Sequence, residues 1–371
     1  MKLFFVVTGI GLGHATRIEA VLNAVLKKDK KCKIKIAGYK SSYTYFKNKG
    51  FKVIKLIGVN YSSEKFKVNI FNILRTNLKY PLNFRRDVKT LMNNIKEFDP
   101  DYVIVDWELS GLIAASNLNK KSLLIFNYDP FTFESFLDKF MLGRTKVLQS
   151  RFVETIYAVA EKRSMAIFIP GLKYEVKNKF HFIDFVVREK YNEVEDEEKL
   201  MEKLRLRKKP ILVMLGGSNF GYDLFEKMKD VIFEIKNEDF IVFGYKKNFK
   251  KKNIVSFKFR ENYLEYLKAS KGVIMLAGHS SFAECAVFKK PCLVFPIRGH
   301  VEQMLNAFTI EKTGIAMVKY LSKIKKEEIE KDLNQFMHNL ENLQERANIL
   351  NARSDGAEEV VRFLFMEKSE E

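Results

Sequence analysis

The stretch Lys2–His14 reads KLFFVVTGIGLGH. Its opening apolar run, rich in β-branched and aromatic side chains, predicts a buried strand over residues 2–8. Glycines at alternate positions then predict a sharp turn, and a helical pattern begins near Ala15. A buried strand, a glycine-rich turn and a helix are together typical of the first unit of a doubly wound parallel sheet.

Further apolar runs of strand length follow along the chain, and helical patterns separate them. They lie at 33–37, 53–57, 102–106, 122–126, 165–169 and 182–187. After a charged run at 193–202 the pattern restarts, with runs at 211–215, 240–243, 254–257, 273–276, 292–295 and 316–318. The sequence therefore predicts an α/β protein with two doubly wound, Rossmann-like domains, residues 1–185 and residues 186–371.

The 371 residues carry a formal net charge of +19, and this excess is unevenly distributed. Residues 1–185 hold 32 basic and 16 acidic side chains, a net +16. A basic first half indicates an anionic partner, such as a phosphate group, a membrane surface or a nucleic acid. The three cysteines form no CxxC pair, which argues against a zinc site or a disulfide framework and favours a cytoplasmic location.

The turn that ends in His14 is the first candidate for chemistry. The dinucleotide fingerprint needs a glycine where His14 stands and an acid after the second strand, so NAD binding is not favoured. Asp106 ends another predicted strand, so both side chains are expected at the carboxyl edge of the sheet. There the carboxylate could hold the imidazole, as in an acid–base dyad. Helix caps are the alternative, with Asp106 capping a helix that starts near Leu109.

Two turns in the second half are candidates for binding a diphosphate, because helix N-termini with nearby hydroxyls attract anions. The residues concerned are Gly216, Gly217 and Ser218 in the first turn and Gly278, His279, Ser280 and Ser281 in the second. Glu284 lies about one helical turn further along the same face, where its carboxylate can accept hydrogen bonds from ribose hydroxyls. Glu302 and Gln303 open the next predicted helix and can meet sugar hydroxyls.

Together these residues resemble the GT-B-fold, nucleotide-sugar-dependent glycosyltransferases, of the type that includes MurG and the UDP-glycosyltransferases. The resemblance implies two Rossmann-like domains facing across a cleft, the first for the acceptor and the second for the donor. It implies that His14 is the general base and is paired with Asp106. For the donor it implies that Glu284 binds ribose, that Glu302 and Gln303 bind the sugar, and that Phe259 and Arg260 touch the base.

The resemblance also implies an inverting transfer from a UDP-sugar co-substrate to an acceptor hydroxyl, without a metal or another cofactor. The triplet Asp99-Pro100-Asp101 is interpreted as a turn and not as a metal site. Gly11, Gly13 and Arg17 are expected on the acceptor side. Arg17 departs from the family, which usually has a proline shortly after the histidine, and it could bind a phosphate or pair with a carboxylate.

Two basic amphipathic stretches, 66–86 and 131–152, favour a lipid or lipid-phosphate acceptor and a peripheral position on the inner face of the cell membrane. Ordinary helices with apolar faces in the core are the alternative. Two other functions remain open: a nucleotide-sugar 2-epimerase on the same fold, and a non-catalytic basic protein that binds nucleic acid or membrane. Lysine clusters at 27–35 and 246–252 are short and lie between elements, so nucleic acid is not an expected partner.

Overall fold

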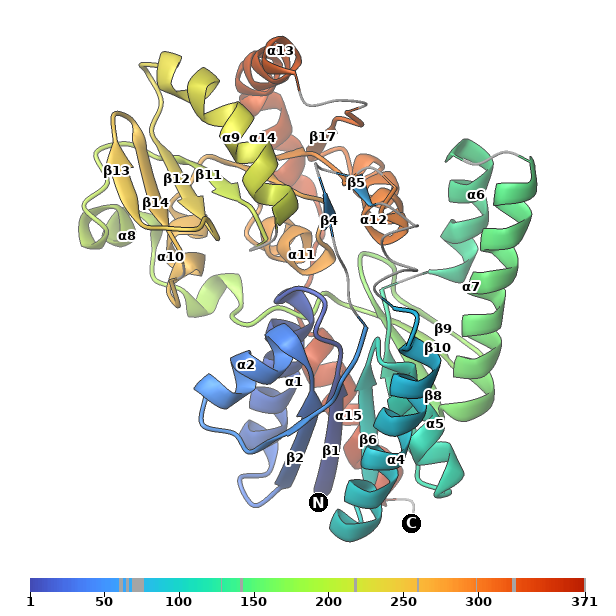
Figure 1. Cartoon of the computed structure of the whole chain (residues 1–371). Coiled ribbons are helices and arrows are strands. Elements are labelled where there is room, and N and C mark those ends of the chain that lie inside the picture. Colours follow the sequence, from blue (N-terminus) through green and yellow to red (C-terminus); the bar gives the residue numbers. More distant parts are fainter. Residues whose placement is uncertain are drawn as a thin grey trace. The chain divides into compact units, whose positions relative to one another are not determined.

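The chain divides into two compact α/β units (Figure 1). Unit 1 comprises Met1–Tyr61, Leu74–Arg188 and Arg353–Glu371, and unit 2 comprises Ser62–Ile73 and Glu189–Ala352. The computed structural model describes residues 1–59, 63–64, 67–68, 77–127, 129–140, 143–216, 219–258, 260–297, 299–321 and 325–369.

The described residues of unit 1 form an eight-stranded sheet. Its spatial order is β3 (Val53–Lys55), β2 (Lys33–Gly38), β1 (Lys2–Val7), β6 (Tyr102–Asp106), β7 (Ser122–Ile125), β8 (Ala166–Pro170), β10 (Phe180–Ile183) and β9 (Glu175–Lys177). Within this sheet only β9 runs antiparallel to its neighbour. Numbered along the chain, the parallel strands follow the order 3-2-1-4-5-6-7, so the winding reverses between β1 and β6. Ligands of doubly wound sheets bind at the carboxyl edge beside such a switch point.

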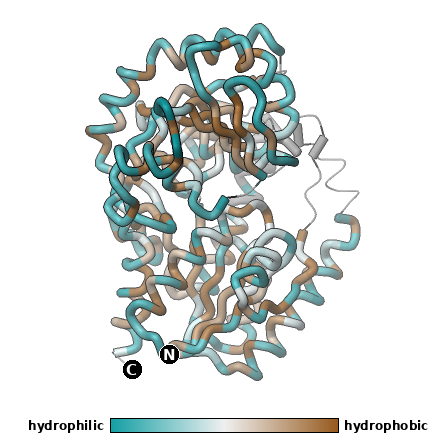
Figure 2. Tube along the Cα trace, turned by 90° about the vertical axis from the view of Figure 1, so that its left-hand side faces the viewer, coloured by the Kyte–Doolittle hydropathy of each residue, from teal (hydrophilic) through white to brown (hydrophobic). Residues whose placement is uncertain are grey.

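Strand β1 is apolar on both faces because helices cover both faces of the sheet. Leu3, Phe5 and Val7 pack into one core with α1 (Gly13–Lys28), α2 (Lys40–Asn48) and α15 (Gly356–Ser369). On the other face lie α4 (Tyr80–Phe98), α5 (Leu109–Asn117) and α7 (Gly143–Arg163), and α6 (Pro130–Phe140) packs beside α7 (Figure 1). Figure 2 shows the hydrophobic residues gathered along the central strands, with hydrophilic residues on the helices around them.

The C-terminal helix α15 belongs to unit 1, and its apolar face lies in the core that α1 covers. The chain enters α15 beside Asp184, where Arg353 Nη2 lies 3.0 Å from Asp184 Oδ1. A Cβ at Gly356 would stand 2.1 Å from the Asp184 carbonyl oxygen, so glycine permits this close approach. Assigning all of 186–371 to the second domain is therefore wrong for residues 353–371. An apolar helix face predicts burial but not which core buries it.

Seven strands form the sheet in the described part of unit 2. Its order is β13 (Phe249–Lys251), β14 (Ile254–Phe257), β12 (Phe240–Phe243), β11 (Ile211–Met214), β15 (Gly272–Met275), β16 (Cys292–Val294) and β17 (Ala316–Val318). The parallel strands follow the order 3-2-1-4-5-6, and the winding reverses between β11 and β15. The helices are α8 (Glu197–Lys203), α9 (Asn219–Glu234), α10 (Tyr263–Lys268), α11 (His279–Val287), α12 (Val301–Glu311), α13 (Lys326–His338) and α14 (Leu340–Ile349), with a 3₁₀ turn at Tyr191–Glu193. The prediction of two doubly wound sheets is confirmed.

The strands that the sequence did not predict are short. The edge strands β9 and β13 have three residues each and are largely exposed, so they contain no apolar run. Unit 2 also takes residues 62–73 from within the first half of the chain. Of these the structure describes β4 (Ser63–Glu64) and β5 (Lys67–Val68), which pair antiparallel. The expected continuous first domain of 1–185 is wrong for this segment.

The two basic amphipathic stretches are only partly described. Residues 65–66, 69–76 and 141–142 lie outside the described residues. In the rest, Phe133 and Phe136 are buried, as the alternative of ordinary helices expects. The exposed large hydrophobic side chains of the two stretches are Leu78, Tyr80, Leu82 and Phe131. Among the described helices, none combines the length and the apolar character that crossing a membrane demands.

Candidate active site

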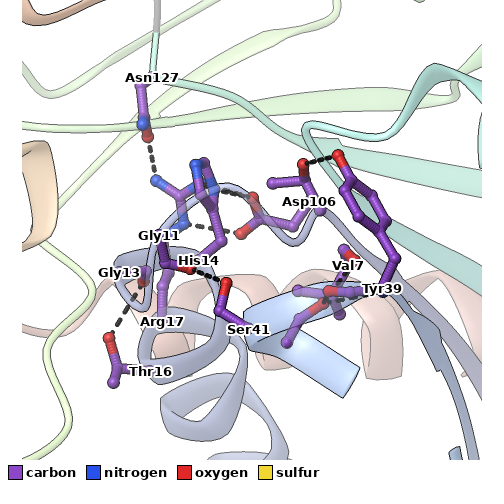
Figure 3. Close-up of polar contacts among 12 residues, drawn as sticks. Val7, Gly11, Gly13, His14, Thr16, Arg17, Tyr39, Ser41, Asp106 and Asn127 are labelled. Carbon is purple, nitrogen blue, oxygen red and sulfur yellow. Dashed lines mark hydrogen bonds and ion pairs between the residues drawn. The ribbon is translucent and has the colours of Figure 1, made fainter. Parts of the chain in front are cut away.

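The glycine turn after β1 is held by the element that follows β2. Ser41 Oγ lies 2.6 Å from the Gly9 carbonyl oxygen and 2.7 Å from that of Gly11, so its hydroxyl donates across the turn (Figure 3). A Cβ at Gly9 would stand 1.9 Å from the Tyr39 carbonyl oxygen. Gly11 has φ +81°, in the left-handed region, but a Cβ there would meet no described atom within 4 Å. The two glycines are thus required for different reasons.

We expect Gly9→Ala to destabilise the protein more than Gly11→Ala. The Gly9 variant must displace the Tyr39 backbone, at a cost of about 3 kcal/mol. The Gly11 variant only places alanine in the left-handed region, at a cost of about 1 kcal/mol. Urea unfolding of both variants measures the difference. Equal losses of unfolding free energy would contradict the close approach of Gly9 to Tyr39.

His14 and Asp106 meet at the switch point of unit 1. His14 Nδ1 lies 2.6 Å from Asp106 Oδ1, and the two residues are 7% and 0% exposed (Figure 3). A carboxylate only accepts hydrogen bonds, so Nδ1 carries a hydrogen, and in the neutral form of the ring Nε2 keeps its lone pair. Neither residue caps a helix, because the N-caps of α1 and α5 are Leu12 and Glu108. The predicted pairing is therefore present, and the capping alternative is wrong.

Arg17 contacts the same carboxylate. Its Nε lies 2.8 Å from Asp106 Oδ2 and its Nη2 lies 2.7 Å from Oδ1, while Nη1 donates to Asn127 Oδ1. Burial alone would raise the pKa of Asp106, but the charges and hydrogen bonds of Arg17 and His14 outweigh it and hold that pKa below its ordinary value. Of the two roles predicted for Arg17, the structure has the pairing with a carboxylate.

A second buried carboxyl group, Glu108, follows two residues after Asp106. Ser110 Oγ donates to Glu108 Oε1 at 2.7 Å. Tyr39 is another neighbour of Glu108, and its OH group lies 2.8 Å from Thr8 Oγ1. Burial raises the pKa of Glu108 to about 7; hydrogen bonds from Ser110 and Tyr39 oppose this shift, and the charge of Asp87 adds to it. Glu108 therefore exchanges a proton near neutral pH.

Sequence reasoning missed Ser41, Asn127 and Glu108. All three follow strands of unit 1 at the carboxyl edge, since β2 ends at Gly38, β7 at Ile125 and β6 at Asp106. A search of every polar residue within four positions of a predicted strand end would have found Ser41, Asn127 and Glu108. The sequence singled out only the residues that matched a motif.

In unit 2, two helix N-termini flank the switch point. Gly216, with φ +66°, turns the chain between β11 and α9, and Gly278 is the N-cap of α11 after β15. Gly217 and Ser218 lie outside the described residues. A Cβ at Gly221 would stand 2.2 Å from the Leu215 carbonyl oxygen, so α9 packs closely on the end of β11. Backbone N–H groups of both helices are thus directed to one edge of the sheet.

The first turns of α11 carry the other predicted donor residues. His279, Ser280 and Ser281 are half-buried, and Glu284 follows on the same face with 5% exposure. Asn306 of α12 donates through Nδ2 to the Ala277 carbonyl oxygen at 3.0 Å, which fixes the end of the strand segment that leads into α11. The structure therefore brings these predicted residues together on one helix.

The loop before α12 positions Glu302 and Gln303. His300 is the N-cap of α12 and its Nδ1 accepts a long hydrogen bond, 3.5 Å, from Gln303 N. Burial holds the pKa of His300 below its ordinary value, in keeping with a neutral, accepting ring. Gln303 Oε1 in turn accepts from Ile297 N at 3.1 Å. The amide oxygen of Gln303 therefore holds its own loop.

Arg260 lies in the loop between β14 and α10, at the same edge of unit 2. It is exposed, and its guanidinium stands 4.4 Å from the centre of the Phe257 ring. Phe259 lies outside the described residues.

The Asp99–Asp101 triplet lies at the opposite edge of unit 1 from His14. Asp99 is the left-handed C-cap of α4, and Asp101 accepts from Lys2 N at 2.6 Å. This geometry is the turn that was predicted. Throughout the described ranges, no group of three or more His, Cys, Asp and Glu side chains is placed to hold a metal ion. All three cysteines are free and buried.

Comparison with known proteins places the chain in a family. The profile of the family described as Glycosyl transferase family 1 matches residues 1–340. The chain belongs to this family. An uncharacterized glycosyltransferase of Methanosarcina mazei is 27% identical to it over 343 residues, which cover 85% of this chain and 84% of the relative. This glycosyltransferase therefore has the activity class that the sequence predicted, in preference to a 2-epimerase or a non-catalytic binder.

The chain is also similar to a bacterial sugar transferase in sequence and to a solved bacterial enzyme in structure. The UDP-N-acetylglucosamine–N-acetylmuramyl-(pentapeptide) pyrophosphoryl-undecaprenol N-acetylglucosamine transferase of Thermosipho africanus is 31% identical over 123 residues, 32% of this chain and 36% of that protein. The crystal structure of Acinetobacter baumannii MurG matches with a TM-score of 0.61 at 15% identity, covering 98% of each chain. The fold is GT-B, as the resemblance implied.

Proposed function

We propose that this glycosyltransferase transfers a sugar from a UDP-sugar to an acceptor hydroxyl by a single, inverting displacement that needs no metal. The observation that carries the proposal is the 2.6 Å contact between His14 Nδ1 and Asp106 at the switch point of unit 1. Nε2 of His14 takes the proton of the acceptor hydroxyl as that oxygen attacks the anomeric carbon. Asp106 stabilises the imidazolium that forms, and the bond to the nucleotide diphosphate breaks on the opposite side.

The donor is assigned to unit 2 and the acceptor to the side of unit 1 that holds Gly11 and Gly13. The N-termini of α9 and α11 stabilise the charge that develops on the leaving diphosphate. Glu284 accepts hydrogen bonds from the ribose, and the sugar contacts Glu302 and Gln303. Uridine as the base is supported by the Thermosipho africanus relative, whose name includes UDP-N-acetylglucosamine as the donor.

The proposed acceptor is a lipid or lipid phosphate at an anionic membrane surface. The net charge of +16 on residues 1–185 supports it, as do the exposed apolar residues Leu82 and Phe131. Lys177 Nζ stands 3.8 Å from the Phe131 ring, so apolar and basic groups share this surface. The acceptor of the Thermosipho africanus relative is also a lipid diphosphate by its name. Sugar transfer to water-soluble alcohols but not to a polyprenyl phosphate would contradict this acceptor.

Thermal unfolding with a panel of nucleotides tests the donor site. UDP at 100 times its dissociation constant is expected to stabilise the protein by about 2.7 kcal/mol. GDP and TDP at the same concentration as UDP are expected to stabilise it less. Glu284→Ala should reduce the stabilisation by UDP, because the ribose loses its hydrogen-bond acceptor. Glu284→Gln should reduce it less, because its amide keeps one of the two acceptor oxygens.

The matched control is Glu345→Ala, since Glu345 is an exposed residue of α14 in the same unit. This variant should keep the full response to UDP. No stabilisation by any nucleotide, or an equal response in the Glu284 variants, would overturn the assignment of the donor to unit 2.

A further inference from the structure

We propose that Arg17 is a positioning residue for the His14–Asp106 dyad and not a ligand for an acceptor or donor phosphate. The inference rests on the proposed role of His14 as the general base. Arg17 lies three residues after His14 on α1, so both side chains leave the same face of the helix. Figure 3 shows the guanidinium beside the imidazole, with both directed at Asp106.

The guanidinium fixes the orientation of the Asp106 carboxylate. It contacts both oxygens, with Nε 2.8 Å from Oδ2 and Nη2 2.7 Å from Oδ1, in the fork geometry that arginine forms with carboxylates. The terminal torsion of an aspartate is otherwise broad. Because Arg17 fixes the plane of the carboxylate, Oδ1 points at His14 Nδ1 and receives its hydrogen. Arg17 thereby selects the ring tautomer in which Nε2 is the base.

Arg17 also balances the charge of Asp106. The side chains of Arg17 and Asp106 are 1% and 0% exposed, so solvent screens their attraction little. Nη2 stands 3.2 Å from His14 Nδ1, and since both atoms bear hydrogens, both are drawn to the Oδ1 that lies between them. Asp106 therefore has a permanent counter-ion before His14 gains a proton. The resting dyad does not need an imidazolium to neutralise its carboxylate.

A role in binding phosphate does not fit this environment. Three nitrogen atoms of Arg17 already donate hydrogen bonds: Nε and Nη2 donate to Asp106, and Nη1 donates to Asn127. Because only 1% of the Arg17 side chain is exposed, an anion would have to displace one of these partners to reach the guanidinium. The hydrogen bond to Asn127 instead attaches the guanidinium to the chain just after β7. Arg17 is therefore held at the ends of two strands, β6 through Asp106 and β7 through Asn127.

Nuclear magnetic resonance of the histidine ring nitrogens tests the proposal without any substrate. The chain has five histidines, and His14→Gln identifies the His14 signals by their loss. The wild type is expected to show hydrogen on Nδ1 and none on Nε2. Arg17→Met should give a mixture of the two tautomers, and Arg17→Lys, which keeps the cation but not the fork, an intermediate result. An unchanged Nδ1–H tautomer in both variants would overturn the proposal, even if sugar transfer proved not to be the activity.

Steady-state kinetics separate positioning from anion binding. A positioning role predicts that Arg17→Lys lowers kcat by about 100-fold and changes the KM of the acceptor and donor less than two-fold. Loss of a phosphate ligand would instead raise a KM and keep kcat, which would contradict the proposal. Lys27→Met is the matched control, because Lys27 is an exposed cation near the end of the same helix. It should leave the ring tautomer and both constants unchanged.

Discussion

His14→Gln is expected to lower the rate of sugar transfer by about 10²–10⁴-fold, the range typical of losing a general base. Glutamine is similar in size and can still donate a hydrogen bond to Asp106, so the loss reports the missing proton acceptor. The KM of the donor should change little, because the donor is assigned to unit 2. The measurement is the initial rate of UDP release, with and without an acceptor.

His338→Gln is the matched control, since His338 is exposed in the last turn of α13. A His14→Gln enzyme that keeps more than a tenth of the wild-type kcat would remove His14 from the mechanism. Asp106→Asn is a less specific test of the dyad, because it also deprives buried Arg17 of its counter-ion.

Glu108→Gln is expected to stabilise the protein at pH 8 by about 3 kcal/mol and at pH 5 by less than about 1 kcal/mol. Burial raises the pKa of Glu108 from 4.5 to about 7 in the folded protein, so folding favours the protonated carboxyl. The stability that the protonated carboxyl group of Glu108 contributes is fully present below pH 4.5 and is lost as the pH rises through 7. Glutamine stays neutral at every pH and removes the cost of ionising a buried group.

Urea unfolding at both pH values measures this effect, with Glu134→Gln, an exposed glutamate of α6, as the control. The control should change the unfolding free energy little at either pH. If Glu108→Gln gains nothing at pH 8, the hydrogen bonds from Ser110 and Tyr39 compensate the ionised carboxylate fully. The carboxyl group would then not exchange a proton near neutral pH.

The sequence predicted the sheets well because their strands are buried on both faces and therefore stand out as apolar runs. The predicted strands at 102–106, 240–243, 254–257 and 316–318 match the observed bounds. His14 and Asp106 could be paired from the sequence because each follows or ends a strand, and these strands are neighbours in a doubly wound sheet. Short exposed strands such as β9 contain no such signal.

The rest of the site depends on distances that a single sequence does not contain. Whether Arg17 binds a phosphate or a carboxylate depends on its 1% exposure and on the position of Asp106. Ser41 and Asn127 act through hydrogen bonds to residues 30 or more positions away. Which of the two cores α15 packs against depends on which core has room for its apolar face. Propensity and motif spacing describe none of these long-range contacts.

The stereochemistry of transfer tests the central claim most directly. Water can serve as the acceptor, so the protein is incubated with a UDP-sugar whose sugar is α-linked, and proton resonance identifies the anomer formed first, before mutarotation. A single displacement with His14 as the base predicts the β anomer, formed by the wild type and lost in His14→Gln. An α anomer formed first, or a β anomer released equally fast by His14→Gln, would contradict the account.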